Sequence, residues 1–508
     1  MAGVKSLAKD TAVYGLSSIV GRFLNWMLVP LYTHCFAVDD YGIVTYVYSV
    51  VALAMVVLTY GMETGFFRFA NHERWNDPME VYSTALISLT GSSVVFVAAT
   101  LAFLNPVSVW MECASHPEYV AIMAVCVALD AVLTMPYSYL RFRGRAMRFA
   151  VIRLVNIGVN IGLNLFFILL CPWLMEHVPG SVEWFYRPEF GIGYIFLANL
   201  IASAVNIAMM IPELCGFRWR FNARLWREML RYSLPLLVLG VAGIMNQTID
   251  KILYPSLVSD PAEAMYGLGI YGANYKIAVV LLVFLQAFRF AYEPFIFARA
   301  KTGSHADREE SFASYRDAMK YFVVFALFIF LAVMFFLGVL RHFVAERYFS
   351  GLKVVPLVML AELFFGIFFN LSVWYKLTDR TVWGMWFSLM GLATTVILNI
   401  VLVPHISYMG CAVAALCSYG FMMAVSYIVG AHKYPIGYPV RRIALYFALA
   451  GAMYLAGVVL LPMAGIGEFA QYAVRVLLLS LYLWTVVKIE HIRPAELLAP
   501  VLSRLRRR

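Results

Sequence analysis

Five charged residues lie in a stretch of the chain that is otherwise apolar enough to cross a membrane twice. They are Asp250, Lys251, Lys276, Arg289 and Glu293, all between positions 232 and 299. A charged side chain at bilayer depth costs about 2.5–3.5 kcal/mol on insertion scales, so it faces a water-filled cavity or a partner. In such a place a cation can attract an anionic group, and a buried carboxylate can carry a proton.

A further cation, Arg22, lies in the first apolar segment of the chain. At about 1.5 Å per residue, Arg22 lies ~17 Å from the inner start of its segment and Lys276 ~15 Å from the outer start of its own. Both are therefore close to the midplane of a hydrocarbon core that is ~30 Å thick. With Lys251 toward the outer side and Arg289 toward the inner side, these four residues predict a graded cationic cavity. For Arg289 the alternative is a local ion pair with Glu293, four residues away on one helix face.

Neutral polar and acidic residues are the next candidates. Three asparagines in apolar segments are expected either to line the cavity or to hold helices together by hydrogen bonds: Asn25, Asn246 and Asn274. Four acidic residues are candidates either for binding a coupling ion or for structural pairing between helices: Asp250, Glu293, Asp130 and Glu362. Asp250 and its neighbour Lys251 point in different directions on a helix, so each is expected to need its own partner.

The amino-acid composition indicates the kind of secondary structure that carries these residues. Of 508 residues, 63% are hydrophobic and only 13% are charged, against about a quarter in a soluble protein. Spans of about 20 apolar residues predict an all-α polytopic membrane protein with fourteen transmembrane helices. The predicted helices are 11–36, 42–67, 81–104, 119–140, 151–171, 191–211, 232–256, 266–297, 318–340, 354–375, 382–403, 409–430, 443–461 and 469–487.

The distribution of Lys and Arg predicts the topology. With the N-terminus inside, 29 of the 39 Lys and Arg residues fall in cytoplasmic segments, and only Arg187, Arg341, Arg347 and Lys353 fall in outer links. This is the asymmetry of the positive-inside rule, so both termini are expected in the cytoplasm. The basic runs lie next to the ends of predicted helices, where they are expected to face anionic lipid headgroups. This position argues against a nucleic-acid partner.

Motifs of enzymatic chemistry are absent from the sequence. The seven cysteines occur singly, without CxxC or His-paired spacing. The sequence contains no recognisable metal site, phosphate loop or nucleophile motif. We therefore expect neither an enzyme nor a metal or other cofactor, with an ion gradient or the membrane potential as the energy source.

The chain repeats itself. The segment 136–168 aligns without gaps to 371–403 at an offset of 235, and 41–54 matches 268–281 at an offset of 227. Six helices are an even number, so both copies start inside and form parallel repeats, as in transporters whose halves rock around a central site. The predicted domains are two pseudo-symmetric six-helix lobes at 1–220 and 221–435, followed by two further helices and a basic tail at 436–508.

Three features resemble a known family. They are the two six-helix halves, the Tyr232-Ser-Leu-Pro start of a helix that carries Asn and Asp near its end, and the pattern N-IVLVP-x5-G-C-A from Asn399. They resemble the polysaccharide transporter branch of the multidrug/oligosaccharidyl-lipid/polysaccharide exporter superfamily. The resemblance implies a flippase for polyprenyl-pyrophosphate-linked oligosaccharide, whose halves alternate access around a cationic cavity. The positions that fit this cavity are Arg22, Lys251, Lys276 and Arg289.

The resemblance also implies the setting and the alternatives. The expected location is the bacterial inner membrane, in the biosynthesis of lipopolysaccharide O-antigen, capsule or exopolysaccharide. The expected partners are the lipid-linked oligosaccharide, membrane lipids, and glycan polymerase and chain-length proteins. The alternatives are a multidrug exporter of the same fold, a lipid II flippase, and a membrane glycan polymerase or ligase, although the last usually needs a large outer loop that this chain lacks.

Overall fold

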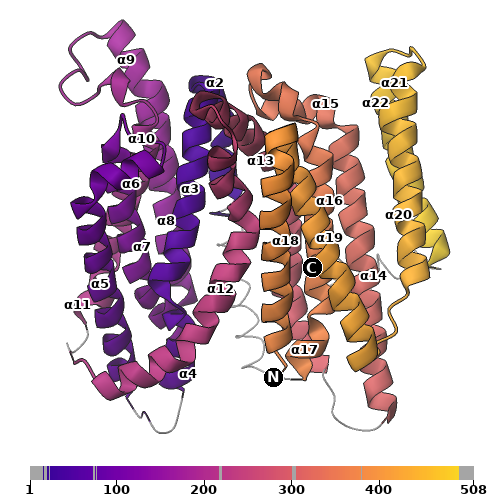
Figure 1. Cartoon of the computed structure of the whole chain (residues 1–508), viewed down its shortest axis with the longest axis horizontal. Helices are drawn as coiled ribbons and strands as arrows, with labels where there is room; N and C mark the ends of the chain where they lie inside the picture. The colour runs from indigo at the N-terminus through magenta and orange to yellow at the C-terminus, as the bar shows by residue number, and fades with distance from the viewer. Residues whose placement is uncertain are drawn as a thin grey trace, which may run out of the picture. The chain divides into compact units, whose positions relative to one another are not determined.

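The structure is a computed structural model of the chain, and its described residues form helices and no β-strand (Figure 1). The described residues are 15, 20–21, 23–71, 75, 77–216, 220–299, 305–378 and 380–490. The side chains of 290–291, 293–295, 297–299 and 305–307 lie outside this description.

The chain forms two compact units. Unit 1 comprises Met1–Lys276, Arg347–Gly351 and Met385–Ser418, and unit 2 comprises Ile277–Glu346, Leu352–Gly384 and Tyr419–Arg508. The helices up to residue 257, all in unit 1, are α2 (Val29–Cys35), α3 (Val38–Thr59), α4 (Met62–Ala70), α5 (Pro78–Ala102), α6 (Leu104–Trp110), α7 (Pro117–Phe142), α8 (Ala146–Leu165), η1 (Phe166–Leu170), α9 (Cys171–His177), η2 (Pro188–Phe190), α10 (Gly193–Met209), α11 (Ile211–Cys215) and α12 (Ala223–Leu257). The division of the sequence into lobes at 220 and 435 stays a prediction.

Three later helices have residues in both units: α13 (Pro261–Arg299), α18 (Val382–Ile406) and α19 (Tyr408–Lys433). The remaining helices are α14 (His305–Phe335), α15 (Leu337–Leu340), η3 (Arg341–Phe343), η4 (Glu346–Gly351), α16 (Val354–Leu371), α17 (Val373–Leu377), α20 (Val440–Tyr454), η5 (Leu455–Leu460), α21 (Leu461–Met463) and α22 (Glu468–Ile489). They belong to unit 2, except for the five residues of η4 that join unit 1.

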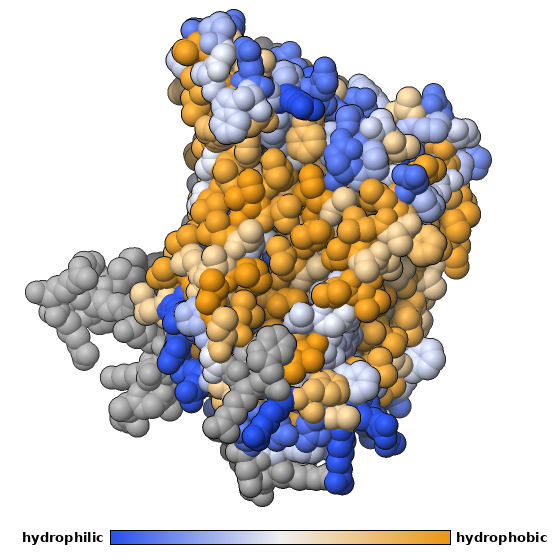
Figure 2. All heavy atoms as spheres, turned by 90° about the vertical axis from the view of Figure 1, so that its left-hand side faces the viewer, coloured by the Kyte–Doolittle hydropathy of each residue, from blue (hydrophilic) through white to orange (hydrophobic). Residues whose placement is uncertain are grey.

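The helices have the length and surface of membrane spans. Among the described residues, twelve helices are long and apolar enough to cross a membrane, and the shorter α10 occupies the predicted sixth span. Figure 2 shows a broad apolar band between hydrophilic ends on the face formed by the helices at the left of Figure 1. The predicted all-α multi-pass fold is confirmed. The number fourteen and the cytoplasmic termini stay predictions, because much of the predicted first span lies outside the described residues.

The predicted second span, 42–67, is not one continuous helix. The helix α3 ends at Thr59 and α4 begins at Met62, and between them Tyr60 (φ 31°) and Gly61 (φ 71°) are left-handed. A left-handed conformation costs a non-glycine residue about 1–2 kcal/mol. Here α12 packs against the break, where the Ser233 hydroxyl lies 3.3 Å from the Gly61 carbonyl oxygen.

A close crossing of α3 and α13 holds unit 1 together. A Cβ atom added to Gly42 would lie 2.0 Å from the carbonyl oxygen of Met265, and one added to Gly269 would lie 1.9 Å from that of Val38. The offset of 227 in the internal repeat makes Gly42 equivalent to Gly269 and Val38 equivalent to Met265. The contact is therefore reciprocal between repeat-related helices, which is the pattern of a two-fold interface.

The segment Arg347–Gly351 is an inserted part of unit 1. The Arg347 guanidinium donates to the carbonyl oxygens of Thr33 at 2.7 Å and His34 at 3.0 Å, which satisfies free carbonyls at the end of α2. The Asn274 amide donates to the Tyr348 carbonyl oxygen at 2.8 Å. The sequence predicted only an outer link at this position, whereas the structure shows it fixed to α2 and α13.

A buried ion cluster joins α14, α20 and α22 in unit 2, which also pack against one another (Figure 1). The Glu490 carboxylate, with 3% of its side chain exposed, pairs with Lys320 and accepts a hydrogen bond from the Tyr446 hydroxyl. Arg442 lies 3.6 Å from the same carboxylate. Burial disfavours the charged form, but these partners outweigh it and lower the pKa of Glu490 below its ordinary value.

We expect Glu490→Gln to lower the free energy of unfolding by about 3 kcal/mol at neutral pH, because it breaks a buried ion pair. A carboxyl whose pKa is lowered by folding stabilises the protein above its unfolded-state pKa of about 4.3 and loses that contribution as the pH falls through its folded-state pKa. Thermal unfolding of both proteins in detergent should therefore show a gap at pH 7 that narrows below about pH 4.3. A gap that does not depend on pH would contradict this ionic role.

Candidate functional site

A polar cavity of about 650 Å³ lies inside unit 1. It is lined from α7, α8 and α10, with Gly21, Asn25, Met55 and Glu63 from earlier in the chain. Nine of the lining residues come from three helices at the spacing of one helix face: Asp130, Thr134 and Tyr137 on α7, Arg153, Asn156 and Asn160 on α8, and Asn199, Ser203 and Asn206 on α10. Each set spans two turns, so all three helices present a polar stripe within an apolar surface.

Hydrogen bonds between these helices order the cavity wall. The Ser203 hydroxyl donates to the Asp130 carboxylate at 2.8 Å, and the Tyr137 hydroxyl donates to the Asn206 amide oxygen at 2.8 Å. The Asn160 amide donates to the Asn199 amide oxygen at 3.2 Å. Because donors and acceptors alternate across three helices, this wall is held in one arrangement.

Two guanidinium groups and two carboxylates share the cavity lining. Arg141 forms an ion pair with Glu63, and the Arg153 guanidinium lies 5.5 Å from the centre of the Tyr137 ring. Asp130 is the other lining carboxylate. Amides offer a donor and an acceptor side by side, as hydroxyl-bearing ligands require, while Arg153 can pair with an anionic group.

The Asp250–Lys251 pair forms a second buried polar cluster in unit 1. The Lys251 ammonium donates to the Asp250 carboxylate at 3.1 and 3.2 Å and to the Gln247 carbonyl oxygen at 3.0 Å. The Tyr271 hydroxyl donates to Asp250 at 2.6 Å, and Lys251 lies 4.1 Å from the centre of the Tyr275 ring. The expectation of separate partners was wrong, because the long lysine side chain bends back to its neighbour.

Lys276 differs from Lys251. Its backbone carbonyl accepts a hydrogen bond from the Trp26 indole at 2.7 Å, which ties α13 to the region before α2. Its ammonium group forms no ion pair or hydrogen bond among the residues that the structure describes, and the side chain is only half-buried. Of the predicted cations with described side chains in unit 1, Lys276 is therefore the one without a described counter-ion.

The predicted asparagines divide between two roles. Asn25 lines the polar cavity. The Asn246 amide donates to the carbonyl oxygens of Ala242 and Ser388, and that of Asn274 donates to Ile270 and Tyr348, each at 2.8 Å. Both of these asparagines connect separate segments of unit 1, as the alternative interpretation of helix pairing predicts.

The remaining predicted residues belong to unit 2 or lie outside the description. The Arg289 guanidinium lies 4.0 Å from the centre of the Phe369 ring, and Glu362 is buried in α16. Arg22 and the Glu293 side chain lie outside the described residues, so the Arg289–Glu293 pair stays a prediction. The cationic cavity of four residues also stays a prediction.

Sequence reasoning missed most of the cavity in unit 1. It selected Asp130 and Asn25 but not Arg153, Asn156, Asn160 or Asn199. The signal was present as the recurrence of polar residues every three to four positions in three apolar helices. These residues are mostly uncharged, so they carry less of the signal that marks the charges in the predicted seventh and eighth helices.

Comparison with known proteins decides the family. The family model described as polysaccharide biosynthesis protein matches residues 7–299, which is more than half of the chain. The chain belongs to this family. The predicted membership is confirmed, and a comparison with curated proteins finds no match.

Solved structures share the fold of this family member. A structure described as lipid II flippase MurJ in an inward closed conformation is 13% identical, with a TM-score of 0.67 over 96% of this chain and all of that chain. An inward-facing multidrug resistance MATE family transporter of the MOP superfamily is 13% identical, with a TM-score of 0.63 over 81% of this chain and 94% of that one. The MATE multidrug transporter DinF-BH is 15% identical, with a TM-score of 0.60 over 84% of this chain and 96% of that one.

These descriptions are of transporters and flippases, in agreement with the prediction of a non-enzymatic protein. The polysaccharide biosynthesis family member is thus a multi-pass membrane protein that shares the fold of these transporters and flippases.

Proposed function

We propose that the protein moves a polyprenyl-pyrophosphate-linked oligosaccharide across the bacterial inner membrane by alternating access, for the synthesis of O-antigen, capsule or exopolysaccharide. The observation that carries this proposal is the amide-lined cavity among the membrane-spanning helices of a polysaccharide biosynthesis family member. Sugar hydroxyls both donate and accept hydrogen bonds, and Asn156, Asn160 and Asn199 offer both groups.

Basic residues supply the second requirement, which is recognition of an anionic linker. Lys276 has no counter-ion among the described residues, and Arg153 faces the cavity beside Tyr137. Together with the predicted Arg22, they can offset the charge of a pyrophosphate in a medium where an unpaired charge is costly.

The energy source is proposed to be an ion or proton gradient that acts through carboxylates. Asp130 is the most suitable described residue, because it lines the polar cavity and accepts a hydrogen bond from Ser203. Asp250 is less suitable, since Lys251 and Tyr271 already occupy its oxygens. Glu293 and Glu362 stay candidates in the second half of the chain.

A glycan complementation assay tests the function. In a strain without its own flippase, we expect the wild-type gene to restore surface polysaccharide and Lys276→Ala or Arg22→Ala to abolish it at unchanged protein levels. Lys276→Arg, which keeps the charge, serves as the matched control and should retain most of the activity. Full export by both alanine variants would overturn the assignment of the cations, and failure of the wild type to restore export would overturn the substrate.

A multidrug exporter is the second candidate. The fold shared with two multidrug transporters and the cavity carboxylate of Asp130 favour it. Rescue of a drug-sensitive strain without restoration of polysaccharide would indicate a multidrug exporter. Rescue of a strain depleted of its lipid II flippase would indicate a lipid II flippase. Turnover of glycan by purified protein without vesicles would instead indicate a polymerase or ligase.

A further inference from the structure

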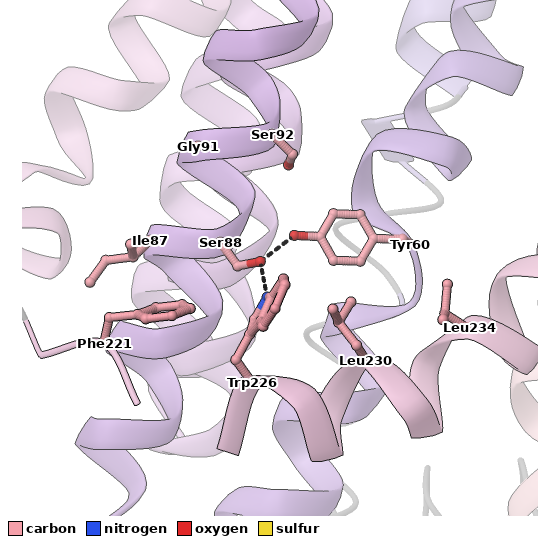
Figure 3. A pocket seen from close by; sticks show the side chains of 9 residues that line it. All are labelled: Tyr60, Ile87, Ser88, Gly91, Ser92, Phe221, Trp226, Leu230 and Leu234. Atoms are coloured by element: carbon pink, nitrogen blue, oxygen red, sulfur yellow. Dashed lines mark hydrogen bonds between the residues drawn. The ribbon is translucent and has the colours of Figure 1, made fainter. Parts of the chain in front are cut away.

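A second hollow of unit 1 lies on the outside of its helices. It is a groove of about 470 Å³ between the α3–α4 break, α5 and the first turns of α12 (Figure 3). Ile87, Leu230 and Leu234 provide its aliphatic lining, and Gly91 provides open space on α5, where an added Cβ would meet nothing within 4 Å. The groove is distinct from the polar cavity, with which it shares no lining residue.

The groove opens toward the bilayer. Val94 and Val95, which follow Gly91 on the same face of α5, are 62% and 68% exposed. On the α12 side Leu234 is 50% exposed. Large apolar side chains with this exposure in a membrane-spanning helix face lipid chains, so a hydrocarbon chain can enter the groove from the side.

A set of hydrogen bonds makes the back wall of the groove rigid. The Trp226 indole donates to the Ser88 hydroxyl at 2.7 Å, and the hydroxyl groups of Tyr60 and Ser88 lie 2.6 Å apart (Figure 3). Each polar atom of this set has a partner, so the wall presents mainly ring and aliphatic carbon to an occupant. Trp and Tyr side chains of this kind are typical of the boundary between headgroups and hydrocarbon.

The edge of the groove is basic. Along α12, Trp226, Leu230 and Leu234 recur every four residues, and Arg227 and Arg231 form the adjacent stripe one position further. Both arginines are exposed and form no ion pair among the described residues, whereas Arg224 lies 3.7 Å from Glu228. An apolar groove beside two free guanidinium groups complements a molecule with a hydrocarbon chain and an anionic head.

We propose that this groove is a binding site for one anionic glycerophospholipid of the cytoplasmic leaflet. The acyl chain lies along Ile87, Leu230 and Leu234, and the phosphate pairs with Arg227 and Arg231. The positive-inside distribution of basic residues places the start of α12 at that leaflet. Because the lipid contacts α5 and α12 together, it fastens the start of α12 to the first helices of unit 1. The site does not depend on the identity of the transported substrate.

Lipid retention by the purified full-length protein tests the site. Native mass spectrometry after exchange into vesicles of equal phosphatidylglycerol and phosphatidylcholine should show one retained phosphatidylglycerol. Two arginines near an anionic head contribute about 30-fold in affinity together. Arg227→Ala/Arg231→Ala should therefore lower the preference for phosphatidylglycerol by about that factor, while Arg224→Ala leaves it unchanged.

Filling the groove provides the second arm. Gly91→Phe places a ring in open space and should abolish the retained lipid without loss of folded protein. The matched control is Gly162→Phe on α8, where an added Cβ also meets nothing within 4 Å. Equal loss in both glycine variants, or equal retention of phosphatidylcholine, would show ordinary boundary lipid only and would overturn the proposal. Stronger retention of polyprenyl phosphate than of phosphatidylglycerol would overturn the choice of occupant.

Discussion

Replacement of Gly269 by valine is expected to prevent folding of unit 1. The Cβ atom alone would lie 1.9 Å from the carbonyl oxygen of Val38 on α3, far inside van der Waals contact. The obstructing atom belongs to the backbone of a long helix, so it cannot move aside as the end of a side chain can. Overpacking of a core costs typically about 1–3 kcal/mol, and occasionally more where, as here, relaxation is blocked. Gly42→Val should have the same effect, since Gly42 makes the reciprocal contact with Met265.

Size-exclusion profiles and thermal unfolding of detergent-purified protein measure this effect. Gly269→Ala should already lower the unfolding temperature strongly, and Gly269→Val should yield aggregate. Gly162→Ala is the matched control, because its Cβ meets open space on a helix of the same unit. An unchanged unfolding temperature for Gly269→Ala would show that α3 and α13 do not cross at these glycines.

Loss of either partner of the Asp250–Lys251 pair is expected to have the second largest effect. Asp250 and Lys251 are 4% and 7% exposed, and removal of one charge leaves the other buried without compensation. Breaking a buried ion pair in this way costs about 3–5 kcal/mol. Asp250→Asn and Lys251→Met should each lower the unfolding temperature, whereas the double variant should recover most of the loss. The asparagine in the double variant can still accept the hydrogen bond from Tyr271.

The double variant also separates two roles of Lys251. Stability in detergent reports the structural role, and restoration of surface polysaccharide in the complementation strain reports the transport role. A stable double variant that exports glycan would show that Lys251 acts only through Asp250. A stable double variant without export would place Lys251 in transport. If the double variant is as unstable as the single ones, the pairing is not the origin of their instability.

The class of the protein and most of its helices can be predicted from local sequence patterns alone. The apolar content indicates a multi-pass membrane protein, and only α-helices and closed β-barrels satisfy the backbone hydrogen bonds within a bilayer. The apolar segments are about 20 residues long, which is the length of a spanning helix and about twice that of a barrel strand. The internal repeat also makes Gly42 equivalent to Gly269. Such local patterns are sufficient to predict the helices and the repeat, since each pattern depends only on residues that are close together along the chain.

The packing of the folded chain determines which polar residues meet. It paired Lys251 with Asp250, because the reach of a flexible side chain is not fixed by its direction on the helix. It also joined polar stripes of α7, α8 and α10 into one cavity around Asp130 and Arg153. Each stripe is only a few residues in an apolar helix, and the three helices must pack before their stripes enclose a common space. That packing depends on shape complementarity between helices, which no single segment contains.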